Sequence, residues 1–183
     1  MKIPKNAKCV FTGIVYDVYQ WEETNFDGSP ATFEAVKRHD SVQVIPTDGK
    51  HVFISREEQP GRKPFYSFFG GRVEKGETPL AAAKRELAEE SGLVSDDWVL
   101  LEKYDVPGRI QWRIHYYAAR ACRVAGKQAL DPGEKIKVLR LPFASFVKRL
   151  AHPEFRLNDH VILSLATLFD RKKVAAFKKS LFG

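Results

Sequence analysis

The sequence is poor in cysteine and has no long apolar run. Its two cysteines, Cys9 and Cys122, are far apart and fit no metal-binding or redox spacing, so we expect two buried free thiols in a reducing compartment. No apolar stretch is long enough to span a bilayer, and the first ten residues lack the apolar segment of a secretory signal. We therefore expect a cytoplasmic protein that does not enter a membrane.

Internal repeats and low-complexity tracts are also absent, and the composition is that of a folded domain. Hydrophobic residues make up 44% of the 183 residues, and the formal net charge is +7. This charge would attract a polyphosphate, an anionic lipid or a nucleic acid without choosing among them. We interpret the densest basic run, residues 171–180, as the solvated face of a C-terminal helix rather than a binding tail, so a nucleic-acid partner is not expected.

Hydrophobic patterning predicts a chain of many strands and few helices. The predicted strands cover residues 10–20, 32–37, 41–46, 51–55, 65–69, 97–103, 112–122 and 136–141. Turn residues at 26–30 predict a hairpin between the first two strands, and Asp48-Gly49 predicts another between the third and fourth. Helices are predicted near 79–91, near 143–151 and from Asn158 onward, the last with core spacing at Val161, Ile162, Leu165, Ala166 and Phe169.

The helix predicted at 79–91 is crowded with glutamates. Thr78 is its expected N-cap, Pro79 its first residue and Gly92 its C-terminal stop. The acids lie beside its buried stripe of Leu80, Ala83 and Leu87, where like charges repel. A divalent cation would remove this repulsion, because hard cations bind several carboxylate oxygens. The alternative is an exposed acidic helix balanced by Lys84 and Arg85.

A longer pattern around this helix favours the metal. Gly71 is followed after five residues by Glu77, and after seven more by the run Arg85-Glu86-Leu87-Ala88-Glu89-Glu90-Ser91-Gly92-Leu93. This run matches the Nudix box, G-x5-E-x7-R-E-U-x-E-E-x-G-U with U aliphatic, at every defined position. The chain therefore resembles the Nudix hydrolase family.

The resemblance implies an α/β (α+β) Nudix fold, a mixed β-sheet sandwiched between helices, here preceded by an N-terminal β-hairpin. It implies hydrolysis of a nucleoside diphosphate linked to another moiety, with Mg²⁺ or Mn²⁺ as the cofactor. By position, the family's metal-binding glutamates match Glu86, Glu89 and Glu90. The turn whose backbone carbonyl adds a ligand matches Gly70 and Gly71, and the residues that brace the loop match Arg85 and Glu77.

Segments outside the box resemble the ADP-ribose and ADP-sugar pyrophosphatase subgroup. These are the F-E-x-V-x-R segment at residues 33–38, the proline–glycine turn at 106–108 and the acidic loop at 131–134. The resemblance implies that Glu134 is a metal ligand or general base, with Glu89 as the other candidate base. It also implies a homodimer paired through the N-terminal strands, residues 1–36, ahead of a hydrolase domain over 37–183. The candidate substrate contacts are Arg38, Arg72 and Trp21.

The chain departs from this subgroup at Ser67-Phe68-Phe69 and at Gln59, so several functions stay open. The leading hypothesis is cleavage of ADP-ribose or another nucleotide sugar to a nucleoside monophosphate and a sugar phosphate. The alternatives are a house-cleaning hydrolase of free or oxidised nucleotides, a non-catalytic nucleotide-sensing module, and RNA-end processing. Trp98, Trp112 and His115 are interpreted as packing residues, and no Ser–His–Asp or Cys–His arrangement is supported.

Overall fold

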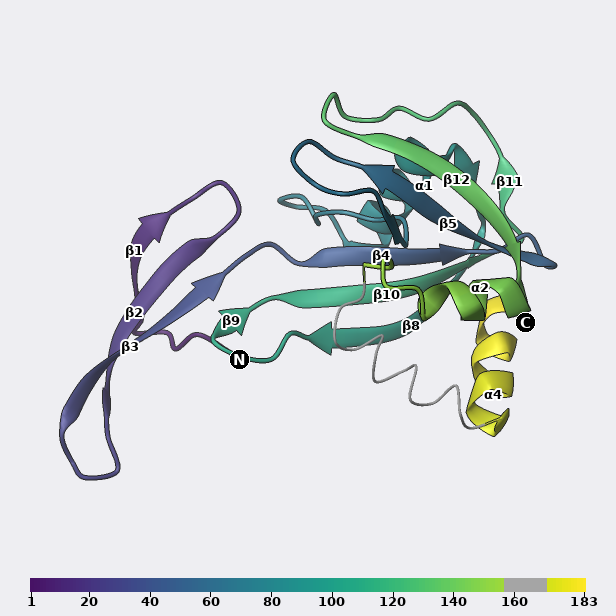
Figure 1. Cartoon of the computed structure of the whole chain (residues 1–183). Helices are drawn as coiled ribbons and strands as arrows, with labels where there is room; N and C mark the ends of the chain where they lie inside the picture. The colour runs from purple at the N-terminus through teal and green to yellow at the C-terminus, as the bar shows by residue number, and fades with distance from the viewer. Residues whose placement is uncertain (157–170) are drawn as a thin grey trace.

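The computed structural model describes residues 1–156 and 171–183 of the chain (Figure 1). The core spacing predicted between Val161 and Phe169 lies outside the described residues. In chain order the elements are β1 (Lys8–Thr12), β2 (Asp17–Thr24), β3 (Pro30–Lys37), β4 (Ser41–Pro46), β5 (His51–Glu58), β6 (Phe65–Ser67), α1 (Pro79–Ser91), β7 (Leu93–Val94), β8 (Asp97–Asp105), β9 (Ile110–Gln111), β10 (Arg113–Arg120), β11 (Arg123–Val124), β12 (Lys135–Pro142), α2 (Phe143–Leu150) and α4 (Arg171–Phe182).

The N-terminal strands form an arm that extends away from the rest of the molecule (Figure 1). β1, β2 and β3 pair antiparallel, and β9 joins β3 in parallel, so the strand order is β1-β2-β3-β9. The hairpin predicted around residues 26–30 is confirmed as the β2–β3 turn. The single strand predicted over 10–20 is wrong, because the chain reverses where Gly13 N–H donates to the Tyr16 carbonyl at 3.0 Å.

The exposure of β1 also corrects the prediction for the cysteines. Every residue of this edge strand is exposed, and Cys9 with them, whereas Cys122 is buried as expected. An edge strand of an arm has no second layer over it, so an apolar pattern there does not lead to burial.

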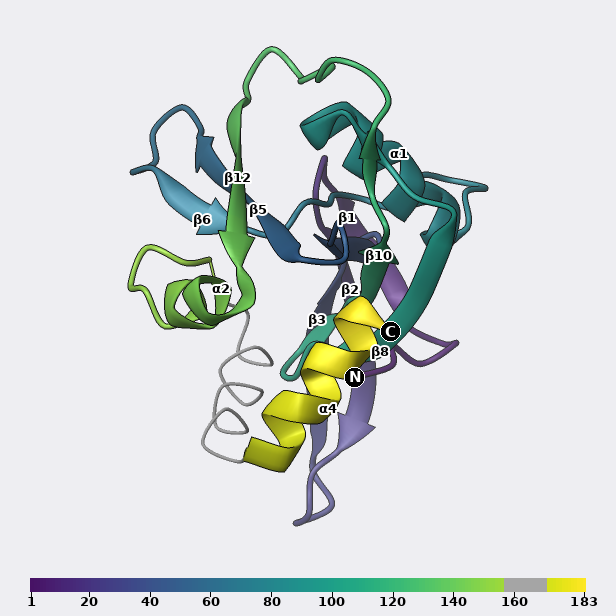
Figure 2. The ribbon, with the colours of Figure 1, turned by 90° about the vertical axis from the view of Figure 1, so that its right-hand side faces the viewer.

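The body of the molecule is a set of β-strands with helices on both sides (Figure 2). Its two main sheets have the orders β4-β10-β8 and β12-β5-β6, and β10 runs parallel to β4 but antiparallel to β8. On one side, Leu87 of α1 shares a core with Val44 and Phe53. On the other side, Phe146 of α2 and Leu181 of α4 share a core with Ile45 and Ile54. These are the strand neighbours of Val44 and Phe53, and their side chains point to the opposite face of the sheet. The predicted mixed sheet between helices is confirmed.

The second predicted hairpin is not formed as a strand pair. β4 and β5 touch through one isolated bridge, Thr47 to Val52, and then belong to different sheets. The free edge of β4 is taken instead by the segment after β6, since Val42 N–H donates to Gly71 O at 2.9 Å and Val44 N–H to Phe69 O at 2.7 Å. This pairing of β4 with residues 69–71 holds the two glycines of the box against the body.

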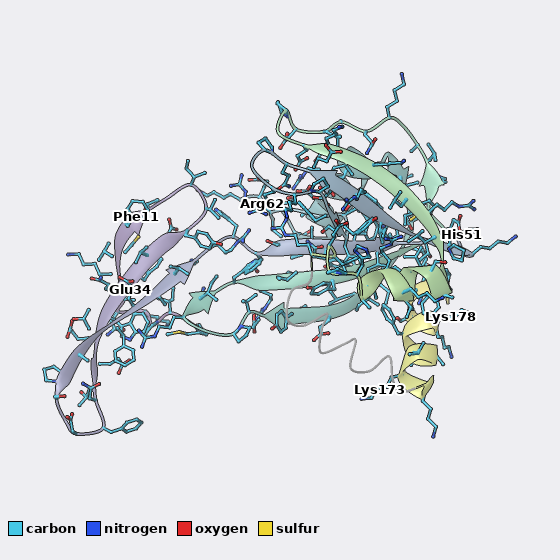
Figure 3. The ribbon with its side chains drawn as sticks, in the orientation of Figure 1. Phe11, Glu34, His51, Arg62, Lys173 and Lys178 are labelled. Carbon is cyan, nitrogen blue, oxygen red and sulfur yellow. The ribbon has the colours of Figure 1, made fainter. Side chains whose placement is uncertain are left out.

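The remaining packing predictions concern aromatic and basic residues. Trp98 packs edge-on against Tyr117, and His115 is buried in β10, as interpreted from the sequence. The basic run lies on α4, from which Lys173 and Lys178 point outward (Figure 3). Of the helices in residues 1–156 and 171–183, none is long and apolar enough to cross a membrane.

Candidate active site

Helix α1 carries most of the candidate site, and local sequence sets its ends. The Thr78 hydroxyl accepts a hydrogen bond from Ala81 N–H at 3.2 Å, and Pro79 follows it as the first helical residue. At the other end Gly92 has φ 70° and donates its N–H to the Ala88 carbonyl. Both ends agree with the prediction, so the register that places the glutamates beside the buried face is the expected one.

The glutamates line a cleft of about 360 Å³ between the body and the arm. Four parts of the chain line it: the β1–β2 turn with Ile14 and Val15, the β3–β4 link with Arg38 and His39, the box with α1, and the loop before β12. The predicted site residues that line this cleft are Gly70, Gly71, Arg72, Arg85, Glu86, Glu89, Glu90, Glu134 and Arg38.

Trp21, a candidate substrate contact, does not line this cleft. It is 6% exposed and lies within the arm, where its ring packs on Phe33 and its indole N–H donates to Glu23. The apolar residues that the arm brings to the cleft are Ile14 and Val15. The side chain of Trp21 thus serves to pack the hairpin in this subunit.

The two box glycines let the backbone approach the acids closely. Gly70 N–H donates to the Glu90 carboxylate at 2.7 Å. A side chain on Gly70 would collide with the Val42 carbonyl, and one on Gly71 would occupy the position of the Glu86 carboxylate. Glycine is therefore required at position 70, where φ is 148° and the obstacle is backbone, whereas at position 71 a side chain would displace the Glu86 carboxylate from its place in the site.

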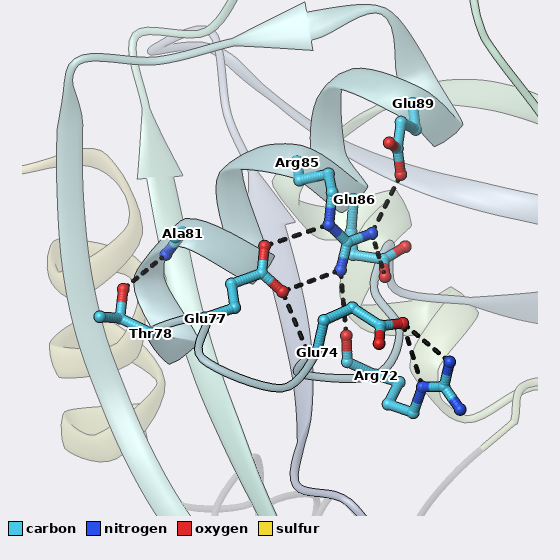
Figure 4. A network of polar contacts seen from close by, with 8 residues as sticks. All are labelled: Arg72, Glu74, Glu77, Thr78, Ala81, Arg85, Glu86 and Glu89. Atoms are coloured by element: carbon cyan, nitrogen blue, oxygen red, sulfur yellow. Dashed lines mark hydrogen bonds and ion pairs between the residues drawn. The ribbon is translucent and has the colours of Figure 1, made fainter.

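Arg85 connects the box loop to the helix (Figure 4). Its guanidinium binds Glu77 through two hydrogen bonds of 3.1 Å, and it reaches Glu86 at 2.8 Å and Glu89 at 3.1 Å. A further bond goes to the backbone carbonyl of Arg72 at 3.0 Å. The hydrogen bonds from Arg85 lower the pKa of Glu77 and keep it ionised. The loop and the helix are thereby held together by one side chain.

The acids deepest in the site are short of positive charge. Glu90 is 6% exposed, and burial raises its pKa to about 9, helped by the charges of Glu57, Glu86 and Glu134. Burial also raises the pKa of Glu86, although Arg85 opposes this shift. The pKa of Glu134 is raised by burial and by nearby Asp131. An additional cation would offset the cost of ionising these groups together.

The donor set fits a hard divalent cation. Glu86, Glu89 and Glu90 supply carboxylate oxygens, Glu134 adds one from a separate loop, and the backbone at Gly70 and Gly71 borders the same cleft. Within the described residues, no three acidic, histidine or cysteine side chains already stand in an ion-binding arrangement. Two of the four carboxylates are instead turned to Arg85. Binding an ion would therefore compete with these ion pairs.

The structure also brings residues near the site that the sequence interpretation missed. His39 lines the cleft beside Arg38, and Glu57 of β5 is buried close enough to Glu90 for their charges to interact. The alternation of β5 carried a signal for Glu57: counting by twos from buried Phe53 leads through Ser55 to position 57. The strand extends three residues beyond the predicted end at Ser55, and this extension is what places Glu57 on the buried face.

Comparison with known proteins decides the family. Residues 37–161 match the model of the NUDIX domain. The chain belongs to the Nudix family. One similar curated relative is the ADP-ribose pyrophosphatase of Bacillus subtilis, which is 27% identical over 76% of this chain and 77% of that protein. Another is the ADP compounds hydrolase NudE of Escherichia coli, which is 26% identical over 63% of each protein. A crystal structure of an ADP compounds hydrolase superposes with a TM-score of 0.73 at 22% identity over 91% of each chain, so the Nudix fold is shared.

Proposed function

We propose that this Nudix protein hydrolyses ADP-ribose or another nucleotide sugar to a nucleoside monophosphate and a sugar phosphate, with Mg²⁺ or Mn²⁺. The observation that carries the proposal is the meeting of Glu86 and Glu90 from α1 with Glu134 from a distant loop in one cleft. Arg38 and Arg72 border the same cleft and suit a diphosphate. The names of the two curated relatives support the same substrate class.

The cleft has a charged part and an apolar part, which match the two halves of such a substrate. The acids and the bound ion would face the diphosphate, while Ile14 and Val15 offer apolar surface to a base or sugar. Arg72 is held by Glu74 through bonds of 2.8 and 3.1 Å and is half exposed. A phosphate can therefore take Arg72 from Glu74 at small cost, because exposed ion pairs contribute little.

The hydrolytic step assigns separate tasks to these residues. A bound divalent cation supplies positive charge that neutralises the diphosphate and makes water more acidic. Glu134 accepts the proton of the attacking water, whose oxygen bonds to phosphorus as the bridging P–O bond breaks. Burial favours this role, because it raises the pKa of Glu134 and so makes its carboxylate a better base. Glu89 is the second candidate for the proton.

The proposed functional unit is a homodimer that pairs through the N-terminal strands, residues 1–36. The arm exposes large apolar side chains outside the cleft: Val10 is 46% exposed and Phe11 60%. Among the described residues no strand pairs with the outer edge of β1, so this edge presents a row of backbone donors and acceptors. Phe11 lies on this outlying arm (Figure 3), where a second subunit has access to it. Burying such a patch against its own copy removes it from water.

A substrate panel with and without metal tests the proposal. ADP-ribose, other nucleotide sugars, dinucleoside diphosphates, free and oxidised nucleoside triphosphates and 5′-triphosphorylated RNA are incubated with Mg²⁺, Mn²⁺ or EDTA, and products are identified by mass. The panel includes oxidised nucleotides because the chain is 36% identical to the E. coli 8-oxo-dGTP diphosphatase over 72 residues. We expect metal-dependent cleavage of a nucleotide sugar. Turnover in EDTA, or none on any diphosphate, contradicts the proposal.

A further inference from the structure

Glu57 is a buried acid that the proposed reaction leaves without a task. It lies on β5 with 6% of its surface exposed, and the Ser55 hydroxyl donates to its Oε1 at 2.5 Å. The same hydroxyl lies 3.0 Å from the Ser67 carbonyl of β6, so Ser55 fixes the Glu57 side chain to the sheet. Glu57 does not line the cleft. In the pairing of β5 with β12 it lies opposite Ile136, two residues after Glu134. The Gln128 side-chain amide donates to the backbone carbonyls of both Ile136 and Glu90, so this strand position is also close to Glu90. It therefore lies near the acids of the cleft without bordering the cleft itself.

Keeping the Glu57 carboxylate ionised in this buried position costs free energy unless a cation is near. Among the residues that the structure describes, Glu57 and Glu90 take part in no ion pair within 4.0 Å, because Arg85 is engaged with Glu77, Glu86 and Glu89. Arg156 attracts Glu57 only through space, while its guanidinium stacks on the ring of Phe65. A buried carboxylate that has hydrogen-bond donors but no paired positive charge is still unfavourable in its ionised form. A divalent ion held by the acids of the cleft would offset that cost for Glu57 too.

We propose that Glu57 is a positioning residue for the metal site, fixed by Ser55, whose negative charge increases the affinity of the Glu90 and Glu134 carboxylates for a divalent cation. It touches neither the ion nor the substrate. The inference rests on the proposed function, since it concerns the cation of that reaction. Groups placed behind the direct ligands commonly change metal affinity by about 10–100-fold when removed, because they set the charge and orientation of those ligands.

Calorimetric titration of the full chain with Mn²⁺ alone tests this proposal. We expect Glu57→Gln to weaken Mn²⁺ binding by about 10–100-fold. Glu58→Gln is the matched control: it removes the same charge one residue away, from an exposed side chain paired with Lys135, and should leave the affinity within about two-fold of wild type. Glu57→Asp keeps the charge and should recover most of the binding. In EDTA, Glu57→Gln should melt at or above the wild-type temperature.

The outcomes separate this inference from the proposed function. If the wild type does not bind Mn²⁺, the proposed function itself fails. If the wild type binds and Glu57→Gln binds equally well, the role of Glu57 is overturned while the proposed function stands. Should Glu57→Gln not fold, Ser55→Ala takes its place: it removes the 2.5 Å bond but keeps the charge, and a several-fold weaker affinity is expected. Unchanged affinity in Ser55→Ala also overturns the inference.

Discussion

Replacing Glu90 with glutamine tests the electrostatics of the site most directly. The carboxyl is almost fully buried, and burial with three neighbouring acids raises its pKa to about 9. Glutamine has nearly the same shape, and its amide oxygen can still accept the 2.7 Å hydrogen bond from Gly70 N–H. It carries no charge, however, and is a poor ligand for a hard cation. The variant therefore separates the charge of Glu90 from its packing.

The expected change in metal-free stability follows from the pKa. Because the folded pKa lies above the unfolded value of 4.5, the stability contributed by Glu90 is complete below about pH 4.5 and is lost as pH rises through about 9. Since pH 7.5 lies three pH units above 4.5, the folded state has lost about 4 kcal/mol of stability at this pH, at about 1.4 kcal/mol per pH unit. Glu90→Gln has no such loss, so in EDTA it should exceed the wild-type free energy of unfolding by about 1–4 kcal/mol.

Denaturant unfolding at pH 5 and pH 7.5, with EDTA or with Mg²⁺, measures both effects. In EDTA the advantage of Glu90→Gln should shrink towards pH 5, where the wild-type carboxyl is neutral at little cost. Saturating Mg²⁺ should stabilise the wild type, by about 2.7 kcal/mol at 100 times its Kd, and the variant much less. Activity should fall by two orders of magnitude or more. A variant that is less stable than wild type in EDTA at pH 7.5, or that keeps the full Mg²⁺ stabilisation, refutes the reasoning.

Three further predictions concern the base, the brace and the arm. Glu134→Gln should lower kcat by about 10²–10⁴-fold with a much smaller change in KM, because a general base acts in the transition state; steady-state kinetics within a few-fold of wild type would exclude that role. Arg85→Lys should lower the free energy of unfolding by about 1–3 kcal/mol, since lysine cannot reproduce the paired bonds to Glu77; an unchanged denaturation midpoint would contradict this. Light scattering should show a dimer at micromolar concentration that Phe11→Asp dissociates, and a wild-type monomer would exclude pairing through the arm.

Much of the candidate site could be predicted from the sequence because it is built locally. The ends of α1 follow from Thr78, Pro79 and Gly92, whose capping effects act within a few residues and do not depend on distant packing. The glutamates follow the helix period once those ends are set. Arg85 and Glu77 are eight residues apart, across a loop and a helix, and both are defined positions of the motif. Their pairing could therefore also be predicted from the sequence.

Strand pairing could not be read from the sequence in the same way, because it is decided by competition between distant segments. The turn at Asp48-Gly49 formed, yet β4 bonds to β10 and to the glycine segment rather than to β5. At residues 10–20 a continuous apolar pattern concealed a chain reversal at Gly13. A pattern of period two indicates a strand, but it does not say which partner takes its edge or whether a second layer covers its face.

The cleft depends on tertiary packing, because distant segments of the chain meet to form it. Its lining comes from segments as far apart in the chain as Ile14 and Glu134, and it excludes Trp21, which its aromatic ring and its place in the N-terminal hairpin had made a candidate. That acids line a helix, and that they suit a cation, follows from the order of residues 77–92. Only folding determined that Glu57 and Glu90 would lose their water, since solvation depends on what packs around a carboxylate rather than on its neighbours in the chain.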